Sequence, residues 1–105
     1  MIDRQILRKA IENGQIKWQR HALERMMERG ITRDSVKQVL LEGEVIEEYI
    51  NDKPYPSGLF FGYIDKQPLH VVAAIDVGNE WCFVITAYTP DLEHFEEDFK
   101  TRRRL

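Results

Sequence analysis

Residues 36–50 read VKQVLLEGEVIEEYI and contain the change of pattern that decides the fold. Before Gly43, the apolar residues Val36, Val39 and Leu40 recur at the three- and four-residue spacing of one helix face. After Gly43, β-branched and aromatic residues gather in short runs, which is typical of strands. The pattern predicts helices on the amino-terminal side of Gly43 and a sheet on its carboxyl-terminal side.

Three helices are expected before this point, at about residues 2–13, 20–29 and 33–42. Asp3 and Thr32 are suited to cap the first and third, because their side-chain oxygens can accept a backbone N–H at a helix start. Each helix is expected to end at a glycine. In chain order, these glycines are Gly14, Gly30 and Gly43. The intervening segment QIKW is predicted to be a short extended link.

Four strands are expected after Gly43, at about residues 44–50, 58–65, 69–76 and 80–88. The loops between them, NDKPYPSG, DKQP and VGN, are short, which favours an antiparallel meander. Both faces of the last two strands are apolar. The sheet is therefore expected to be covered on both sides, or to present its second face to a partner.

A C-terminal helix is expected over about residues 91–102, opened by Thr89 and Pro90. Its spacing would dock three apolar side chains, Leu92, Phe95 and Phe99. Residues 1–105 are thus predicted to form a single α+β domain, with N-terminal helices followed by a four-stranded antiparallel sheet and a C-terminal helix.

The composition limits the classes of protein to which the chain can belong. A chain of 105 residues with 43% hydrophobic residues is the size of one compact domain. No apolar run approaches the roughly 20 residues of a membrane span, and the N-terminus is charged, so we expect a cytoplasmic protein with no membrane partner. The net charge of −3 argues against a general nucleic-acid binder, although residues 15–37 are basic and residues 38–65 acidic. Cys82 stands alone and is expected to be a small buried hydrophobe.

The segment RHALERMMERG, residues 20–30, carries cations at helical spacing. At about 100° per residue, His21, Arg25 and Arg29 line one edge of the apolar stripe. Arginine can hold two phosphate oxygens at once, and histidine can exchange a proton near neutral pH, so the three could act on a phosphodiester. The alternative is a solvated helix face, in which Glu24 and Glu28 form ion pairs with neighbouring arginines.

RNA cleavage without a metal needs a second proton-transfer group, and the predicted sheet offers His70, Thr86 and Tyr88. If residue 74 opposes residue 82 across the VGN turn, then His70 opposes Thr86 and Tyr88 lies diagonally beside it. The alternative is that His70 is a hydrogen-bonded core residue and Tyr88 an ordinary residue at the rim.

The segments RHALERMMERGIT, GEVIEEY, DKPYPSGLFFG, PLHVV and TAYTPDLEHFEEDF together resemble the bacterial domain-of-unknown-function 4258 family, over about residues 15–102. The resemblance implies a relation to the RelE and BrnT ribonuclease toxins, cleavage of RNA or ribosome-bound mRNA, and neutralisation by a small zinc-finger antitoxin. We assign catalytic roles to His21, Arg25, His70 and Tyr88, and RNA binding to Lys17, Arg20, Arg29 and Tyr55.

No cofactor is expected, and the three histidines lack the spacing of zinc ligands. A second hypothesis is a non-catalytic interaction domain, whose exposed apolar sheet face binds a partner or a second copy of the chain as a homodimer. The two hypotheses separate on one point of geometry. The ribonuclease requires the cationic helix edge and His70 to open into the same pocket.

Overall fold

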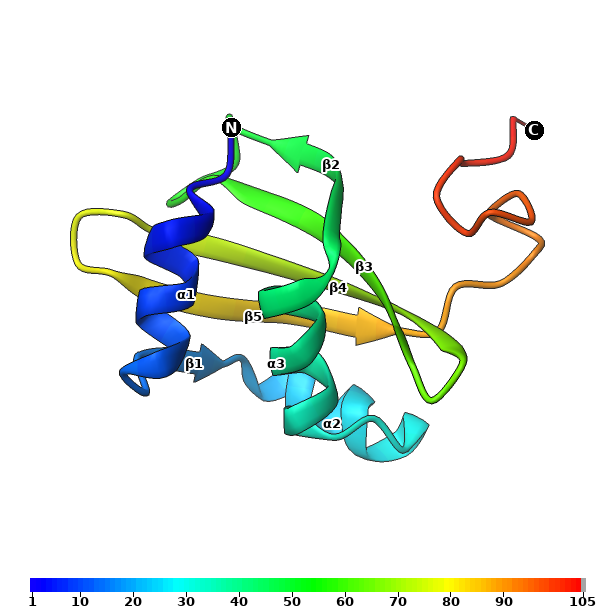
Figure 1. Cartoon of the computed structure of the whole chain (residues 1–105), viewed down its shortest axis with the longest axis horizontal. Helices are drawn as coiled ribbons and strands as arrows, with labels where there is room; N and C mark the ends of the chain where they lie inside the picture. Colours follow the sequence, from blue (N-terminus) through cyan, green and yellow to red (C-terminus); the bar gives the residue numbers. More distant parts are fainter. Residues whose placement is uncertain (105) are drawn as a thin grey trace.

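The computed structural model describes residues 1–104, and in that range the chain forms three helices and one five-stranded sheet. The helices are α1 (Arg4–Glu12), α2 (Arg20–Arg29) and α3 (Arg33–Glu42). The strands are β1 (Ile16–Trp18), β2 (Glu44–Tyr49), β3 (Ser57–Ile64), β4 (Gln67–Asp76) and β5 (Trp81–Tyr88). The α+β class is confirmed, and the helices precede all strands but β1 (Figure 1).

The predicted helix boundaries are close to those observed. The Asp3 side chain accepts a hydrogen bond from the Ile6 amide at the start of α1. Thr32 does the same for the Ser35 amide at the start of α3. Gly30 ends α2 in the left-handed conformation, with φ of 69°, which glycine adopts without steric cost. Local capping chemistry therefore sets where these helices begin and end.

The sheet differs from the prediction because QIKW is not a simple link. Ile16–Trp18 forms the edge strand β1, which pairs parallel to β5 and gives the strand order β1-β5-β4-β3-β2. The other neighbouring pairs are antiparallel, as predicted. The expectation of a four-stranded antiparallel sheet is thus wrong, because it lacks the parallel edge strand β1. A strand of three residues is too short to show a clear periodicity in the sequence.

One face of the sheet packs against all three helices and forms the core. Alternate residues of β4, from Leu69 to Ile75, share one apolar cluster with Met26 of α2 and Val39 of α3. The intervening β4 residues lie on the opposite side of the sheet, which we call the outer face. They are His70, Val72, Ala74 and Asp76. The alternation places His70 away from the helices.

The register between β4 and β5 also differs from the prediction. Near the turn Ile75 pairs with Cys82, and a bulge between Val72 and Ala73 then shifts the pairing. As a result His70 faces Tyr88 directly, while Thr86 faces Val72. A bulge inserts one extra residue into a strand, and the apolar pattern on both faces here gave no signal of it.

The predicted C-terminal helix is not formed. Residues 90–104, which we call the tail, are turns joined by an isolated antiparallel bridge between Phe95 and Arg102. The tail lies at the end of the sheet farthest from α1 (Figure 1). Asp98 accepts hydrogen bonds from two backbone amides, those of Lys100 and Thr101, and Phe99 has a positive φ of 59°. Short acidic side chains compete in this way with helical hydrogen bonds.

The described residues contain no helix with the length and apolar character that a membrane span requires.

Candidate functional site

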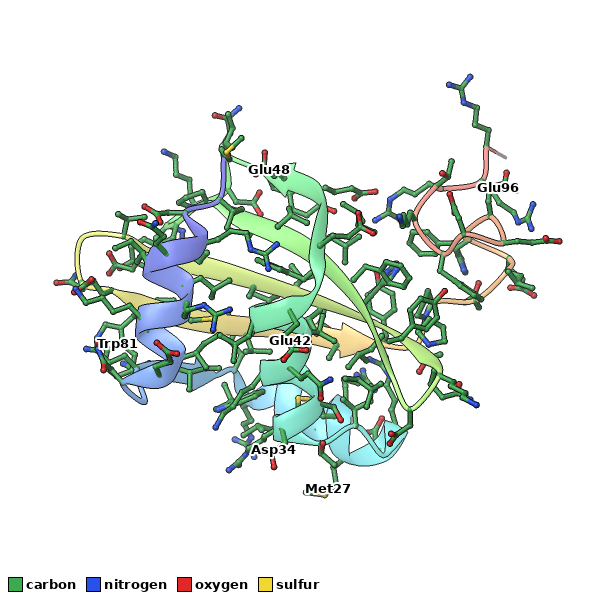
Figure 2. All side chains as sticks on the ribbon, viewed as in Figure 1. Met27, Asp34, Glu42, Glu48, Trp81 and Glu96 are labelled. Atoms are coloured by element: carbon green, nitrogen blue, oxygen red, sulfur yellow. The ribbon has the colours of Figure 1, made fainter. Side chains whose placement is uncertain are left out.

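The cations predicted on α2 lie on a solvated surface. His21 is 86% exposed, and Arg20 and Arg25 form ion pairs with Glu24 and Glu28 at 3.1 and 3.2 Å. The neighbouring Met27 also points away from the sheet (Figure 2). For His21, Arg20 and Arg25 the structure therefore matches the alternative of a solvated helix face. The carboxylates nearest to them, those of Glu24 and Glu28, lie on the same helix.

His70 is completely buried on the outer face, beneath the tail. Its Nε2 lies 2.7 Å from the carbonyl oxygen of Phe99, and its Nδ1 lies 3.2 Å from the hydroxyl of Tyr88. A carbonyl can only accept, so Nε2 carries the proton and Nδ1 accepts from the Tyr88 hydroxyl. The rings of Phe61 and Phe95 contact the imidazole edge to face. His70 is held in one neutral tautomer by an almost complete shell of partners.

Burial lowers the pKa of His70, since charging the imidazole would cost solvation. The neighbouring Arg102 lowers it further, whereas the Phe99 carbonyl and Glu47 act in the opposite direction. Burial also raises the pKa of the Tyr88 hydroxyl. Both groups are therefore neutral near pH 7.

The predicted convergence of α2 with His70 is wrong for His21 and Arg25. α2 packs through Ala22 and Met26 on the helix-covered side of the sheet, while His70 lies on the outer face. The sheet separates the two groups. The helical spacing was read correctly, but spacing along one helix does not tell which side of the sheet a later strand residue faces.

Arg29 is the α2 cation that reaches the sheet. It is the last residue of α2, and its Nη1 donates to the carbonyl oxygen of Ala87 at 2.8 Å. One guanidinium carries five N–H groups, so this bond leaves others available. Arg29 thus stands at the end of β5, beside Tyr88.

A cavity of about 490 Å³ opens at this point. It is lined by the end of α2, the end of β5 and the tail, through Arg29, Tyr88, Thr89, Asp91, His94, Phe95 and Arg102. We call it the tail pocket. It unites a predicted catalytic residue, Tyr88, and a predicted RNA-binding residue, Arg29, with a histidine and an arginine that the sequence interpretation had not assigned.

His94 is oriented by a carboxylate. Its Nδ1 lies 2.8 Å from Oδ1 of Asp91, and the same oxygen accepts the backbone amides of Glu93 and His94. The hydrogen bond from His94 lowers the pKa of Asp91, so the carboxylate is ionised near neutral pH. This arrangement leaves Nε2 of the exposed imidazole as the nitrogen that can meet a substrate.

Arg102 closes the pocket from the tail. Its guanidinium holds the carboxylate of Glu47 on β2 through two hydrogen bonds, of 2.7 and 3.1 Å, and lies 5.1 Å from the centre of the Phe95 ring. The bonds from Arg102 lower the pKa of Glu47, and the same contact raises that of Arg102. The cation is fixed in place but is partly neutralised by its carboxylate.

The remaining predicted RNA-binding residues lie elsewhere. Lys17 sits over the ring of Trp81 at 5.0 Å, and Tyr55 stacks on Phe83 with ring centres 5.4 Å apart. The carboxylate of Asp76 raises the pKa of Tyr55. Trp81 and the tail residue Glu96 lie at opposite ends of the molecule (Figure 2). Lys17 and Tyr55 are therefore not part of the tail pocket.

Three side chains of the tail are of kinds that bind metal ions and lie close together. One ligand atom each of Asp91, Glu93 and His94 lies within 4.8 Å of the others. All three side chains are exposed, and Nδ1 of His94 is already bonded to Asp91. Exposed acidic groups at this spacing are common without an ion, so the cluster supports no metal assignment.

The sequence held one signal for the Asp91–His94 pair. Asp91 follows Pro90 directly, and an aspartate at that position often accepts amides two and three residues ahead in a turn. The predicted helix over residues 91–102 would instead place this aspartate in its first turn, where a carboxylate also suits the helix dipole.

The domain-of-unknown-function family DUF4258 matches residues 18–89. The chain belongs to this family. The match spans α2, α3 and the four strands that follow, and it includes Arg29, His70 and Tyr88. It ends at Thr89, so the tail lies beyond it. No curated protein matches the chain.

The tail pocket of this DUF4258 chain is consequently built from two sources. The family region supplies the scaffold, with the guanidinium of Arg29 and the hydroxyl of Tyr88. The residues after it supply His94 with its aspartate, and Arg102.

Proposed function

We propose that the chain is a toxin-like, metal-independent endoribonuclease of a toxin–antitoxin pair, acting in the cytoplasm, with the tail pocket as its active site. The single observation that carries the proposal is the meeting of Arg29, Tyr88, His94 and Arg102 around one open cavity. Cations for phosphate and a solvent-facing imidazole are what phosphodiester cleavage by an adjacent ribose hydroxyl requires.

His94 is the proton acceptor in this scheme. Its Nε2 takes the proton of the ribose 2′-hydroxyl, and the 2′ oxygen attacks phosphorus. The bond from phosphorus to the 5′ oxygen then breaks, which leaves a 2′,3′-cyclic phosphate and a 5′-hydroxyl whose proton comes from water in the open pocket. Asp91 keeps the imidazole in the productive tautomer and stabilises its charged form.

Arg29 and Tyr88 position the substrate. The unused N–H groups of Arg29 would bind a non-bridging phosphate oxygen, where charge develops in the transition state. The Tyr88 hydroxyl gives its proton to His70 and so faces a substrate as an acceptor. These roles replace those first assigned to His21 and Arg25.

The test is cleavage of a single-stranded RNA by the purified protein in the presence of a metal chelator. Replacing His94 by alanine is expected to lower the rate by about a hundredfold or more, because general acid–base groups contribute about 10² to 10⁴. The matched control is His21→Ala, purified identically, since His21 is exposed and lies outside the pocket. Equal rates for the two variants would overturn the assignment, as would activity that the chelator abolishes.

A non-catalytic interaction domain remains the second candidate, and two observations favour it. The guanidinium groups of Arg25 and Arg102 are bound to carboxylates, which reduces the positive charge available to RNA. The outer face also carries a stack of Tyr55 on Phe83 away from the tail. Under this hypothesis, no variant of the pocket changes the fate of RNA. The zinc-finger antitoxin suggested by the family resemblance would then be a binding partner without an enzyme to inhibit.

A further inference from the structure

The tail is attached to the sheet at few points. Phe95 is its only buried hydrophobic side chain beyond Pro90 in the described range, with 3% of its surface exposed. Ion pairs join Lys100 to Glu44 and Arg102 to Glu47 on the edge strand β2. Ion pairs of this partly exposed kind are weak, because water and salt screen them. The firm part of the attachment is therefore the contact of the tail with His70.

His70 binds the tail through both its ring and its nitrogen. Its imidazole packs against the ring of Phe95 at 4.7 Å, and its Nε2–H donates to the backbone carbonyl of Phe99 at 2.7 Å. Its other nitrogen accepts from Tyr88, which lines the tail pocket. One buried side chain thus connects β4, β5 and the tail.

We infer that His70 is a positioning residue that, in its neutral form, docks the tail and so assembles the tail pocket, and that protonation of His70 releases the tail. The claim that His70 docks the tail does not depend on any enzymatic activity of the chain. Its consequence for RNA cleavage rests on the proposed function, because His94 and Arg102 reach the pocket only from a docked tail.

The surroundings of His70 oppose a positive charge. Of the groups that face it, Phe61 on β3 is apolar, and Tyr88 on β5 is neutral and donates to Nδ1. Arg102 of the tail and Glu47 of β2 have opposite effects on His70, and they are paired with each other. A proton on Nδ1 would displace the hydrogen bond from Tyr88 and leave a buried cation without a carboxylate of its own.

The direction of the pH effect follows from the lowered pKa of His70. When the tail is undocked, His70 is expected to titrate near its ordinary pKa of about 6.5. Docking is therefore favoured above that pH and is weakened as the pH falls below it, because protons bind preferentially to the undocked form. At about pH 5 the undocked fraction would rise by up to about thirtyfold relative to about pH 8.

The decisive experiment is an NMR titration of the whole chain without RNA. The reporters are the ring of His70 and the amides of Glu96 and Arg103, which bond to the carbonyls of Thr101 and His94 within the docked tail. Tail amides are expected to shift towards random-coil values with the same midpoint as the His70 ring, while core amides of α3 stay unchanged. Protonation of His70 with the tail still docked would overturn the inference, and so would tail release at a different midpoint.

Two variants separate positioning from mere packing. His70→Gln keeps a donor for the Phe99 carbonyl but cannot titrate, so its tail is expected to stay docked and to lose the pH response. His94→Gln, the matched control, removes an exposed tail histidine and is expected to keep the response. A response lost in His94→Gln or kept in His70→Gln would reject the inference. If His70→Gln does not fold, the titration of the wild-type chain still shows whether the tail is released with the midpoint of the His70 ring.

The outcome does not depend on ribonuclease activity. If the tail titrates with His70 but no RNA is cleaved, the proposed function fails and the docking mechanism stands. If RNA is cleaved in a manner that depends on His94 but the tail does not titrate with His70, the docking mechanism fails alone.

Discussion

Helix α2 and the tail are both rich in charged side chains but have different structures. Both contain a histidine, arginines and several carboxylates at spacings of three and four residues. In α2 the carboxylates pair with arginines on the same helix, as Glu28 does with Arg25. In the tail the carboxylates of Asp91 and Asp98 accept backbone amides instead. Carboxylates therefore support a helix in α2, where they belong to glutamates, and oppose it in the tail, where the shorter aspartate side chains bond to the backbone.

The polar site lies where the backbone is irregular and not along the regular helix. A regular helix on the surface directs its polar side chains into solvent, as His21 shows with its exposed ring. The irregular backbone of the tail bends back on the sheet and brings His94 beside Tyr88. Residues with the best helical spacing are consequently not the ones that meet across the fold.

The largest effect is expected from removing the apolar anchor of the tail. Replacing the buried Phe95 by alanine is expected to cost about 3 to 5 kcal/mol of docking free energy, the usual cost of deleting a buried aromatic ring. Leu92→Ala is the matched control, because Leu92 is 50% exposed in the same segment and should change stability by about 0.5 kcal/mol or less. Hydrogen exchange of the Arg103 amide measures both. Equal protection in the two variants would show that Phe95 does not anchor the tail.

A similar contrast can be drawn on α2, with a somewhat smaller effect. Met26 is 2% exposed and Met27 is 83% exposed, although they are neighbours. Met26→Ala is expected to lower the free energy of unfolding by about 2 to 3 kcal/mol, whereas Met27→Ala should leave it within about 0.5 kcal/mol. Equilibrium denaturation gives both values. If Met27→Ala were the more damaging variant, the face that α2 presents to the core would be misassigned.

Much of the fold could be predicted because local chemistry sets it. Asp3, Gly30 and Thr32 mark helix ends through hydrogen bonds within a few residues, and the strands follow runs of β-branched and aromatic residues. Three features could not be predicted, because each depends on distant contacts. They are the parallel pairing of β1 with β5, the bulge in the β4–β5 pair and the folded-back tail.

The candidate site was predicted only in part for the same reason. Tyr88 and Arg29 were selected, and both line the tail pocket. His70 was selected as a catalytic group but is buried, because Phe95 and Phe99 of the tail cover it on the outer face. His94 was missed, since its role depends on a turn that the helical spacing of the tail concealed. The chemistry of each residue was visible in the sequence, whereas its neighbours were not.

A second pH response of the tail is expected in a more acidic range. Hydrogen bonds from the amides of Thr101 and Lys100 lower the pKa of Asp98 from 3.8 to about 2. A carboxylate with a lowered pKa stabilises the docked tail above its ordinary pKa, and that stabilisation is lost as the pH falls towards about 2. Asp98→Asn is therefore expected to weaken the tail modestly at neutral pH and to abolish this acid transition.

The measurement is an NMR titration of the Lys100 and Thr101 amides in a His70→Gln background, because the tail of that variant is expected to stay docked in acid. Glu97→Gln serves as a control, since this exposed neighbour has no bond to those amides among the hydrogen bonds of the described residues. If the acid transition were unchanged in Asp98→Asn, an interaction other than the Asp98 hydrogen bonds would stabilise this turn.

The smallest effect is expected on α2 itself. Arg25→Ala removes an ion pair with Glu28 in which both side chains are more than half exposed, and such pairs contribute about 0.5 kcal/mol or less. RNA cleavage should also be unchanged, because Arg25 does not line the tail pocket. Arg29→Ala, one turn further along, should lower cleavage through loss of its phosphate contact. Comparing the two variants in one assay tests which α2 arginine matters, because a large loss with Arg25→Ala would return the active site to the exposed edge of the helix.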